Sequence, residues 1–346
     1  MDRLLSSATR RLFLFGLLLL GLGTGQSVFA QSSTGGTVSV AGDGTLTIGG
    51  LLQTDAYLGG ASGDQFRARS TRLRLGGQID QLQYVVQTDF SSPSILLDAF
   101  ARLPLTNRVR VRAGLFKTPF SAEFLTPRPD ILFAERARAV NNIAPNRQAG
   151  VTLSATLLPD GLSATVGAFN GTRGLSPNDN DLFLYVGRLD GQVPVGENQL
   201  ELGTNVGYSI DDDVGLSALN RPRFAGTRFL FGIDARLETD RWLVAGELNT
   251  AELDPRGIGI PSRLSSTEPL GFYLAAGANV AADHQLVARF DQFDPDVPTQ
   301  AAPDDQLTLG YNYEPSSTLR VLLNYQTPLG EISDGFLTAR LQVALR

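Results

Sequence analysis

The stretch that decides the fold lies at the end of the chain, where residues 337–346 read Leu-Thr-Ala-Arg-Leu-Gln-Val-Ala-Leu-Arg. Apolar residues occupy every second position from Leu337 to Leu345, and Thr338, Arg340 and Gln342 stand between them. Successive side chains of a β-strand point to opposite faces of the sheet. The face with Arg340 cannot lie in a sandwich core, because burying an unpaired guanidinium is costly. The pattern predicts a strand with one face in lipid and the other in water.

The same alternation recurs along the chain, in segments separated by turn residues. Short turns such as Asp80-Gln81 alternate with longer polar loops such as 171–181, 210–222, 252–269, 294–305 and 328–335. Short periplasmic turns and long extracellular loops are typical of outer-membrane barrels. The sequence therefore predicts an all-β fold, a transmembrane antiparallel β-barrel of 16 strands that forms one domain over residues 45–346. Its expected strands are 45–57, 66–79, 82–90, 95–103, 108–117, 148–158, 162–170, 182–190, 199–209, 223–238, 241–251, 270–280, 285–293, 306–314, 318–327 and 336–346.

Residues 1–30 have the pattern of a cleaved signal peptide. A basic start is followed by an apolar run from Leu12 to Leu22 and by Val28-Phe29-Ala30, which resembles a cleavage site. The alternative, a membrane anchor, is disfavoured because a spanning helix needs about 20 apolar residues. We therefore expect export to the bacterial outer membrane, with residues 31–44 as a short periplasmic segment. That segment is too short for the plug domain of an energy-coupled receptor.

Composition disfavours catalysis, metal binding and nucleic-acid binding. The chain has no cysteine and one histidine, His284, which follows Asp283 in an expected turn, and its net charge is −6. Thiolate sites and Ser-His chemistry are therefore disfavoured, and an acidic balance does not suit nucleic acid. We expect no enzyme activity, no cofactor and no metal. The acidic runs Asp211–Asp213 and Asp304-Asp305 are expected in external loops, as solvated surface or weak cation sites toward lipopolysaccharide.

The connection between Lys117 and Gln148 is unlike the other loops. It has about 30 residues without strand alternation, yet it contains apolar side chains such as Phe120, Phe133 and Ile143. Loops of this length in compact proteins are usually functional or disordered. We expect this third external loop to fold into the lumen and narrow it. The alternative is a loop that caps the barrel or contacts a neighbour.

Basic residues are concentrated in residues 66–147, with 13 Arg or Lys against six Asp or Glu. Lys117 is the only lysine of the chain. Guanidinium groups in a narrow aqueous channel favour anions. The alternative is that they pair with Asp89, Asp98, Glu123, Asp130 and Glu135 and stiffen the wall. The expected anion-contacting residues are Arg72, Arg74, Arg102, Arg108, Arg110 and Arg112 on lumen faces, and Lys117, Arg128, Arg136, Arg138 and Arg147 in or beside the loop.

Several pieces of this region occur in an order that is familiar from one family. Gly114-Leu-Phe-Lys-Thr-Pro-Phe120 is followed by Glu123, by Asp130-Ile-Leu-Phe-Ala-Glu-Arg136 and by Ala144-Pro-Asn-Arg147. This resembles the phosphate-selective porin O and P family. The resemblance implies a trimeric barrel that carries phosphate or polyphosphate. It would place six residues around the constriction: Lys117, Glu123, Asp130, Glu135, Arg136 and Arg147.

The chain also differs from the pattern that the resemblance implies. Phosphate-specific members use clustered pore lysines, and this chain has one lysine; it also ends in Arg346 instead of an aromatic residue. The expected function is passive diffusion of small hydrophilic solutes, with a preference for anions and with phosphate as a candidate solute. The alternative is a non-conducting structural or enzymatic barrel. Expected partners are outer-membrane lipid, lipopolysaccharide, small anionic solutes and two further copies of the chain.

Overall fold

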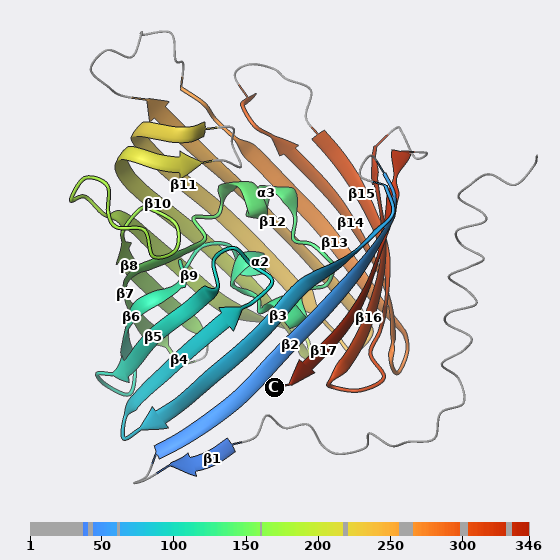
Figure 1. Cartoon of the computed structure of the whole chain (residues 1–346), viewed down its shortest axis with the longest axis horizontal. Helices are drawn as coiled ribbons and strands as arrows, with labels where there is room; N and C mark the ends of the chain where they lie inside the picture. Colours follow the sequence, from blue (N-terminus) through green and yellow to red (C-terminus); the bar gives the residue numbers. More distant parts are fainter. Residues whose placement is uncertain are drawn as a thin grey trace, which may run out of the picture.

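The fold is a closed β-barrel, seen here in a computed structural model of the chain (Figure 1). The structure describes residues 37–40, 44–60, 63–159, 161–216, 221–255, 266–297, 304–329 and 334–345. The expected signal peptide, residues 1–30, and Arg346 lie outside these residues. Within them, no helix is long and apolar enough to cross a membrane.

Sixteen antiparallel strands, β2 to β17, form the wall, each paired with its neighbours in the sequence. The barrel closes because β17 also pairs with β2, from Phe336 opposite Gly59 to Leu345 opposite Gly50. The strands are β2 Gly44–Gly59, β3 Gln65–Ile79, β4 Leu82–Asp89, β5 Leu96–Pro104, β6 Val109–Lys117, β7 Arg147–Leu158, β8 Leu162–Phe169, β9 Leu184–Val195, β10 Asn198–Leu216, β11 Arg221–Glu238, β12 Trp242–Pro255, β13 Leu270–Ala281, β14 His284–Asp294, β15 Asp304–Tyr313, β16 Leu319–Pro328 and β17 Phe336–Leu345.

The prediction of a 16-stranded barrel is confirmed, and each expected segment coincides with one strand. One further strand, β1 (Thr37–Val40), was not expected, and it pairs with β2. The expected loop 210–222 is wrong at both of its ends, because β10 continues through Asp211–Asp213 to Leu216 and β11 begins at Arg221, while 217–220 lie outside the described residues. Asp304-Asp305 likewise begins β15 instead of lying in a loop. Acidic residues at this position suggested an exposed loop, but Asp211 is buried in the strand. It pairs there with Arg228 of β11, with 3.1 Å between Oδ2 and Nε.

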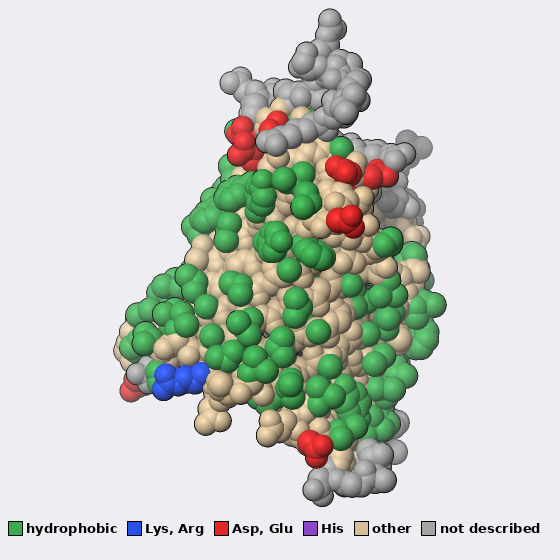
Figure 2. All heavy atoms as spheres, turned by 90° about the vertical axis from the view of Figure 1, so that its left-hand side faces the viewer, with side chains coloured by type: hydrophobic (Ala, Val, Ile, Leu, Met, Phe, Trp, Pro, Cys, Tyr) green, Lys and Arg blue, Asp and Glu red, His purple; other side chains and the backbone are tan. Residues whose placement is uncertain are grey.

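The two faces of the wall differ as the alternation requires. In β17, Leu341 and Leu345 are about half exposed on the outside, whereas Thr338, Arg340 and Gln342 are buried on the inside. Figure 2 shows hydrophobic side chains spread over the outer wall, with acidic side chains near its two ends. This distribution fits a wall that crosses a bilayer, where lipid contacts the middle and water the ends.

Residues 118–146, which we call the inserted segment, connect β6 to β7. They contain the short helices α2 (Ala122–Leu125) and α3 (Arg138–Ile143) and the 3-10 turn η1 (Arg128–Asp130). In Figure 1, α2 and α3 are drawn within the outline of the barrel, and α3 contacts β12, β13 and β14. Apolar side chains of the segment, among them Phe120, Phe133 and Val140, are buried in one cluster with inward-facing side chains of the wall. Burial of this cluster holds one side of the segment to the wall.

Candidate functional site

The lumen of the barrel is the candidate site, and three buried arginines on the C-terminal strands bind the inserted segment there. Arg340 of β17 donates to the carbonyl oxygen of Ala134 and makes a two-point ion pair with Asp55 of β2, at 2.7 Å for each contact. Arg320 of β16 donates to the carbonyl oxygens of Ile131 at 2.8 Å and Pro129 at 3.2 Å. Buried backbone carbonyl oxygens need hydrogen-bond donors. These arginines supply donors to carbonyl oxygens of the segment that lie outside its α-helices.

Arg289 of β14 and several polar side chains complete this attachment. The Arg289 guanidinium donates to the carbonyl oxygen of Glu135 at 3.0 Å and lies over the ring of Phe133, 4.7 Å from its centroid. Other inward-facing side chains bond to the segment backbone from β10, β12, β14, β15 and β16; they are Asn205, Glu247, Asp291, Asn312 and Asn324. The segment is therefore attached over a wide arc of the wall, from β10 to β2.

Lys117 and Arg136 bind the end of α2. The Lys117 ammonium donates to the carbonyl oxygens of Phe124, Leu125 at 3.2 Å and Thr126 at 3.0 Å. Arg136 donates to the carbonyl oxygens of Glu123 at 2.9 Å and Thr126 at 2.7 Å. An ammonium has three donors, so all donors of Lys117 are used in this contact.

Glu135 is the common partner of three arginines. Arg69 of β3 makes a two-point contact with its carboxylate, at 2.6 and 2.8 Å, and Arg128 and Arg340 lie within 3.5 Å and 3.3 Å of it. Burial by itself raises the pKa of Glu135, but the hydrogen bond from Arg69 and the charges of the three arginines outweigh it and lower the pKa to about 2. Glu135 is therefore ionised throughout the ordinary pH range.

Glu123 has the opposite environment. Burial raises its pKa, although Arg289 and the backbone N–H of Ala137 favour the ionised form. The N–H of Ala137 donates to the Glu123 carboxylate at 2.8 Å. Glu123 thus contributes to the fold of the inserted segment on the side of β12 and β14.

A basic cavity of about 630 Å³ lies between the inserted segment and strands β3, β5 and β6. Seven basic side chains line it against two carboxylates, Asp98 and Asp130. Three of the seven have carboxylate partners: Arg72 contacts Asp89 at 3.0 Å, Arg147 contacts Asp98 at 3.0 Å, and Arg128 contacts Glu135. Lys117 is used by carbonyl oxygens. The remaining three are Arg74, Arg102 and Arg112.

These three and Arg110 form what we call the open arginines. Among the described residues, none of the four lies within ion-pair distance of a carboxylate. Arg102 and Arg112 also line an adjoining cavity of about 210 Å³, which includes Arg110 and one carboxylate, Asp190. Arg112 lies over the rings of Phe100 and Phe116, at 4.9 and 5.1 Å from their centroids. The open arginines therefore present positive charge to the water of the lumen without a direct ion pair among the described residues.

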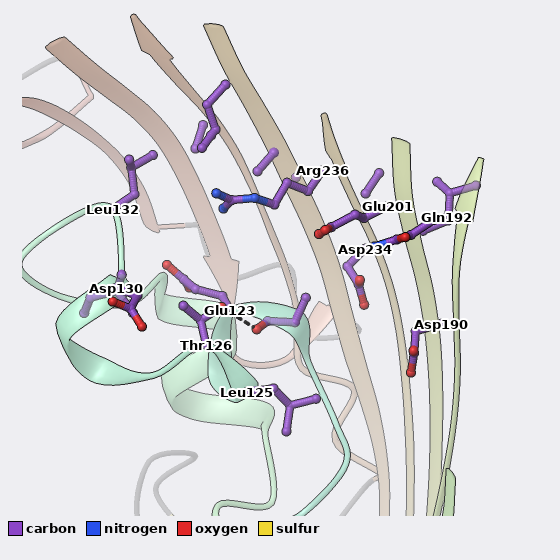
Figure 3. Close-up of a pocket in the computed structure, with 18 of the residues that line it drawn as sticks. Glu123, Leu125, Thr126, Asp130, Leu132, Asp190, Gln192, Glu201, Asp234 and Arg236 are labelled. Atoms are coloured by element: carbon purple, nitrogen blue, oxygen red, sulfur yellow. Dashed lines mark hydrogen bonds between the residues drawn. The ribbon is translucent and has the colours of Figure 1, made fainter. Parts of the chain in front are cut away.

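A second cavity of about 660 Å³ lies on the other side of the inserted segment, against β9 to β13. Figure 3 shows its charged side chains, with Asp190, Glu201, Asp234 and Arg236 on the wall and Glu123 and Asp130 on the inserted segment. Its five carboxylates belong to Glu123, Asp130, Asp190, Glu201 and Asp234, and its two guanidiniums to Arg188 and Arg236. Arg188 pairs with Asp234 at 2.7 Å. We call this the acidic cavity.

The sequence prediction treated all eleven basic residues as one set, and the structure separates them. Arg74, Arg102, Arg110 and Arg112 are open; Arg72, Arg128 and Arg147 are in ion pairs; Lys117 and Arg136 bind carbonyl oxygens. Arg138 pairs with Asp304 near the barrel end. Arg108 precedes β6 in an exposed turn, and it lines none of the cavities described here. The alternative of structural pairing thus holds for part of the set.

Sequence reasoning missed the arginines that hold the segment, above all Arg69, Arg289, Arg320 and Arg340. The inward direction of Arg289, Arg320 and Arg340 follows from strand alternation, whereas Arg69 lies at a register shift between β2 and β3 that alternation does not reveal. For all four, the chain offers no local signal for their partners. Arg340 and Asp55, for example, are 285 positions apart. Within the described residues, no group of His, Asp or Glu side chains is arranged to hold a metal ion.

The closed barrel, its apolar outer wall and its charged lumen define an outer-membrane porin. Comparison with families shows which one: the phosphate-selective porin O and P family matches residues 53–253, more than half of the chain. The chain belongs to this family. Comparison with curated protein sequences gave no match.

Solved structures share the fold at low sequence identity. An anion-selective porin from Comamonas acidovorans is 15% identical, with a TM-score of 0.63, over 87% of this chain and 99% of that one. OmpT of Vibrio cholerae in a trimer form is 14% identical, with a TM-score of 0.61, over 87% and 99%. Salmonella typhi OmpF, in complex with daunomycin, is 13% identical, with a TM-score of 0.62, over 89% and 100%. These likenesses describe the fold alone.

Proposed function

We propose that this porin is a passive, anion-preferring diffusion channel without catalytic activity. The observation that carries the proposal is the set of open arginines, Arg74, Arg102, Arg110 and Arg112. They face a lumen that the inserted segment narrows, and among the described residues no carboxylate lies within ion-pair distance of them. Positive charge on the wall of a narrow pore lowers the energy of a passing anion and raises that of a cation.

The route that we propose passes along the basic cavity, between the inserted segment and strands β3 to β6. The paired arginines Arg72 and Arg147 stiffen this wall, and the open arginines contact the solute. In this proposal Glu123 and Glu135 act indirectly, because they hold the fold of the inserted segment. Asp130 lines both cavities. No cofactor or metal is needed for diffusion down a gradient.

Two parts of the proposal concern partners and solute. A homotrimer is supported by the trimer form of OmpT, which shares the fold. Lipid would cover the apolar outer wall, and lipopolysaccharide would meet its outer end. Phosphate is the solute that the family description names, and arginine can replace lysine in binding it because guanidinium donates two parallel hydrogen bonds to phosphate oxygens.

Reconstitution in planar lipid bilayers tests the proposal. In a tenfold gradient of KCl, the sign of the reversal potential should show chloride passing more easily than potassium. Added phosphate should carry current or reduce the chloride current if it enters the same route. A preference for potassium would contradict the anion proposal, and a folded protein without conductance would contradict the channel itself.

A further inference from the structure

The basic cavity has two chemically different walls. One wall carries the guanidiniums of Arg74, Arg102 and Arg112, from β3, β5 and β6. The other wall comes from β2, β17 and the inserted segment; its apolar side chains include Leu51, Leu125, Pro127, Pro129 and Ala344, and Arg128 and Asp130 lie among them. A pocket with an apolar lining and a few convergent charged groups is the usual form of a site for a small organic ligand.

Two aromatic rings stand on the arginine side of the cavity. The guanidinium of Arg112 lies over Phe100 and Phe116, at 4.9 and 5.1 Å from the centroids, and that of Arg102 lies 5.8 Å from the Phe100 centroid. A guanidinium that stacks on a ring is held in place while its N–H groups, which lie in its plane, stay available to an acceptor. The rings thus orient two donor groups, and the partly exposed ring of Phe100 adds an apolar surface beside them, whereas Phe116 is buried.

This arrangement does not suit inorganic phosphate. Phosphate has acceptor oxygens on all sides, and the leucine, alanine and proline side chains of the second wall have no donors to replace the water that oxygens facing them would lose, which is costly. A carboxylate with an apolar body has its charge at one end only. Its carboxylate can meet the guanidiniums while its body contacts the rings and the leucine and proline side chains.

We propose, on the basis of the anion channel argued above, that this cavity binds small organic carboxylates with a flat apolar body, and binds them better than inorganic phosphate. Benzoate is the simplest member of the class. The cavity, at about 630 Å³, is larger than one such molecule, so a bound carboxylate slows chloride without sealing the route. Because its contacts with the cavity are weak, the bound carboxylate is also released again.

The test measures how well different anions reduce the chloride current of the wild-type channel in planar bilayers. Benzoate, acetate and inorganic phosphate are added at equal ionic strength. Benzoate should halve the current at a concentration about tenfold lower than either of the others, because burial of its ring adds to the charge interaction. Equal concentrations for benzoate and acetate, or a lower one for phosphate, would overturn the inference while the anion channel remains.

Variants at one ring separate its contribution from that of charge. Phe100→Leu should reduce the advantage of benzoate over acetate to about threefold or less, since the flat surface is lost. Phe100→Tyr keeps the ring and should keep the advantage. Phe229→Leu, which removes a ring from the exposed outer face of β11, is the matched control and should behave as wild type. A Phe100→Leu channel with an undiminished advantage would contradict the site.

A binding measurement keeps this inference separate from the proposed function. Saturation-transfer NMR on the detergent-solubilised wild-type barrel detects bound benzoate without any current. If the channel prefers cations or does not conduct, the proposed function fails, and the NMR experiment still decides whether benzoate binds. No transfer to benzoate at millimolar concentration would refute the site directly.

Discussion

Two groups of arginines on the inner face of the same barrel have different roles. Arg289, Arg320 and Arg340, on β14, β16 and β17, are 1%, 8% and 1% exposed, and each donates to backbone oxygens of the inserted segment. Arg102 and Arg112, on β5 and β6, face a cavity and have no carboxylate within ion-pair distance among the described residues. Both groups consist of arginines whose side chains point into the lumen.

The difference comes from the path of the inserted segment. It lies against the wall from β10 round to β2, where arginines become structural because they satisfy its carbonyl oxygens. It leaves space in front of β5 and β6, where arginines stay available to solutes. The role of an arginine in the lumen therefore depends on whether the inserted segment or open space lies in front of its guanidinium.

The largest effect is expected where a buried ion pair is broken. Arg340→Gln leaves the Asp55 carboxylate buried without its partner and removes a donor to Ala134, so we expect a loss of about 3–5 kcal/mol in the free energy of unfolding. Denaturant unfolding followed by tryptophan fluorescence and gel mobility measures it. Arg138→Gln, in a pair that is 29% and 55% exposed, is the control and should cost about 1 kcal/mol or less. Equal losses of stability in the two variants would contradict the distinction between the buried and the exposed ion pair.

The next effect is a dependence on pH that comes from Glu135, whose pKa is lowered to about 2. A carboxylate with a lowered pKa stabilises the fold above its ordinary pKa, and this contribution is lost as the pH falls through the lowered value. The stabilisation, about 3 kcal/mol at neutral pH, should therefore be complete above about pH 4.5 and decline toward pH 2. Unfolding midpoints at pH 7 and pH 3 measure it.

Glu135→Gln provides the control for that experiment. The variant should be less stable at pH 7 and should lose less stability than wild type between pH 5 and pH 2, as titration near these values no longer involves this group. If the free energy of unfolding fell equally steeply with decreasing pH in the wild type and the variant, the contacts of Arg69, Arg128 and Arg340 with Glu135 would not contribute to stability.

A smaller effect, on selectivity and not on stability, is expected for an open arginine. Arg112→Gln should lower the ratio of chloride to potassium permeability about threefold, which corresponds to a loss of less than 1 kcal/mol of attraction in a wet pore. The free energy of unfolding should change by less than about 1 kcal/mol. Reversal potentials and denaturant midpoints measure the two quantities on the same preparation. Arg108→Gln, in the exposed turn, changes the same charge outside the cavities and should leave the ratio near wild type.

The smallest effect is expected for Asp190, a carboxylate that lines both the acidic cavity and the adjoining cavity of the open arginines. Asp190→Asn removes one carboxylate from the acidic cavity and should raise the ratio of chloride to potassium permeability by less than about twofold. The effect is limited because Arg188, 3.5 Å away, already offsets part of this charge. Asp240→Asn, in a short turn, is the control. A larger change than that of Arg112→Gln would mean that Asp190, and not the open arginines, dominates the selectivity.

Strand alternation was enough to predict the barrel. Most of the sixteen strands could be placed to within a few residues, because lipid and water impose the same alternation on every strand and short turns separate the strands. It also determined that arginines such as Arg102, Arg112 and Arg340 point inward, since direction follows from position along a strand. The misplaced loop at 210–222 arose where strand pairing continues and the acidic Asp211 has an inward partner, Arg228.

Which of the inward arginines are open depends on long-range contacts in the folded chain. Strand alternation is local, whereas the partner of a side chain depends on segments far away in the chain, such as Asp55 for Arg340. Lys117 shows the same limit: its position in the sequence suggested an anion contact, and its three donors go to carbonyl oxygens of the inserted segment. The path of that segment is set by packing of its apolar side chains and by satisfaction of its backbone. Neither can be read from a local pattern.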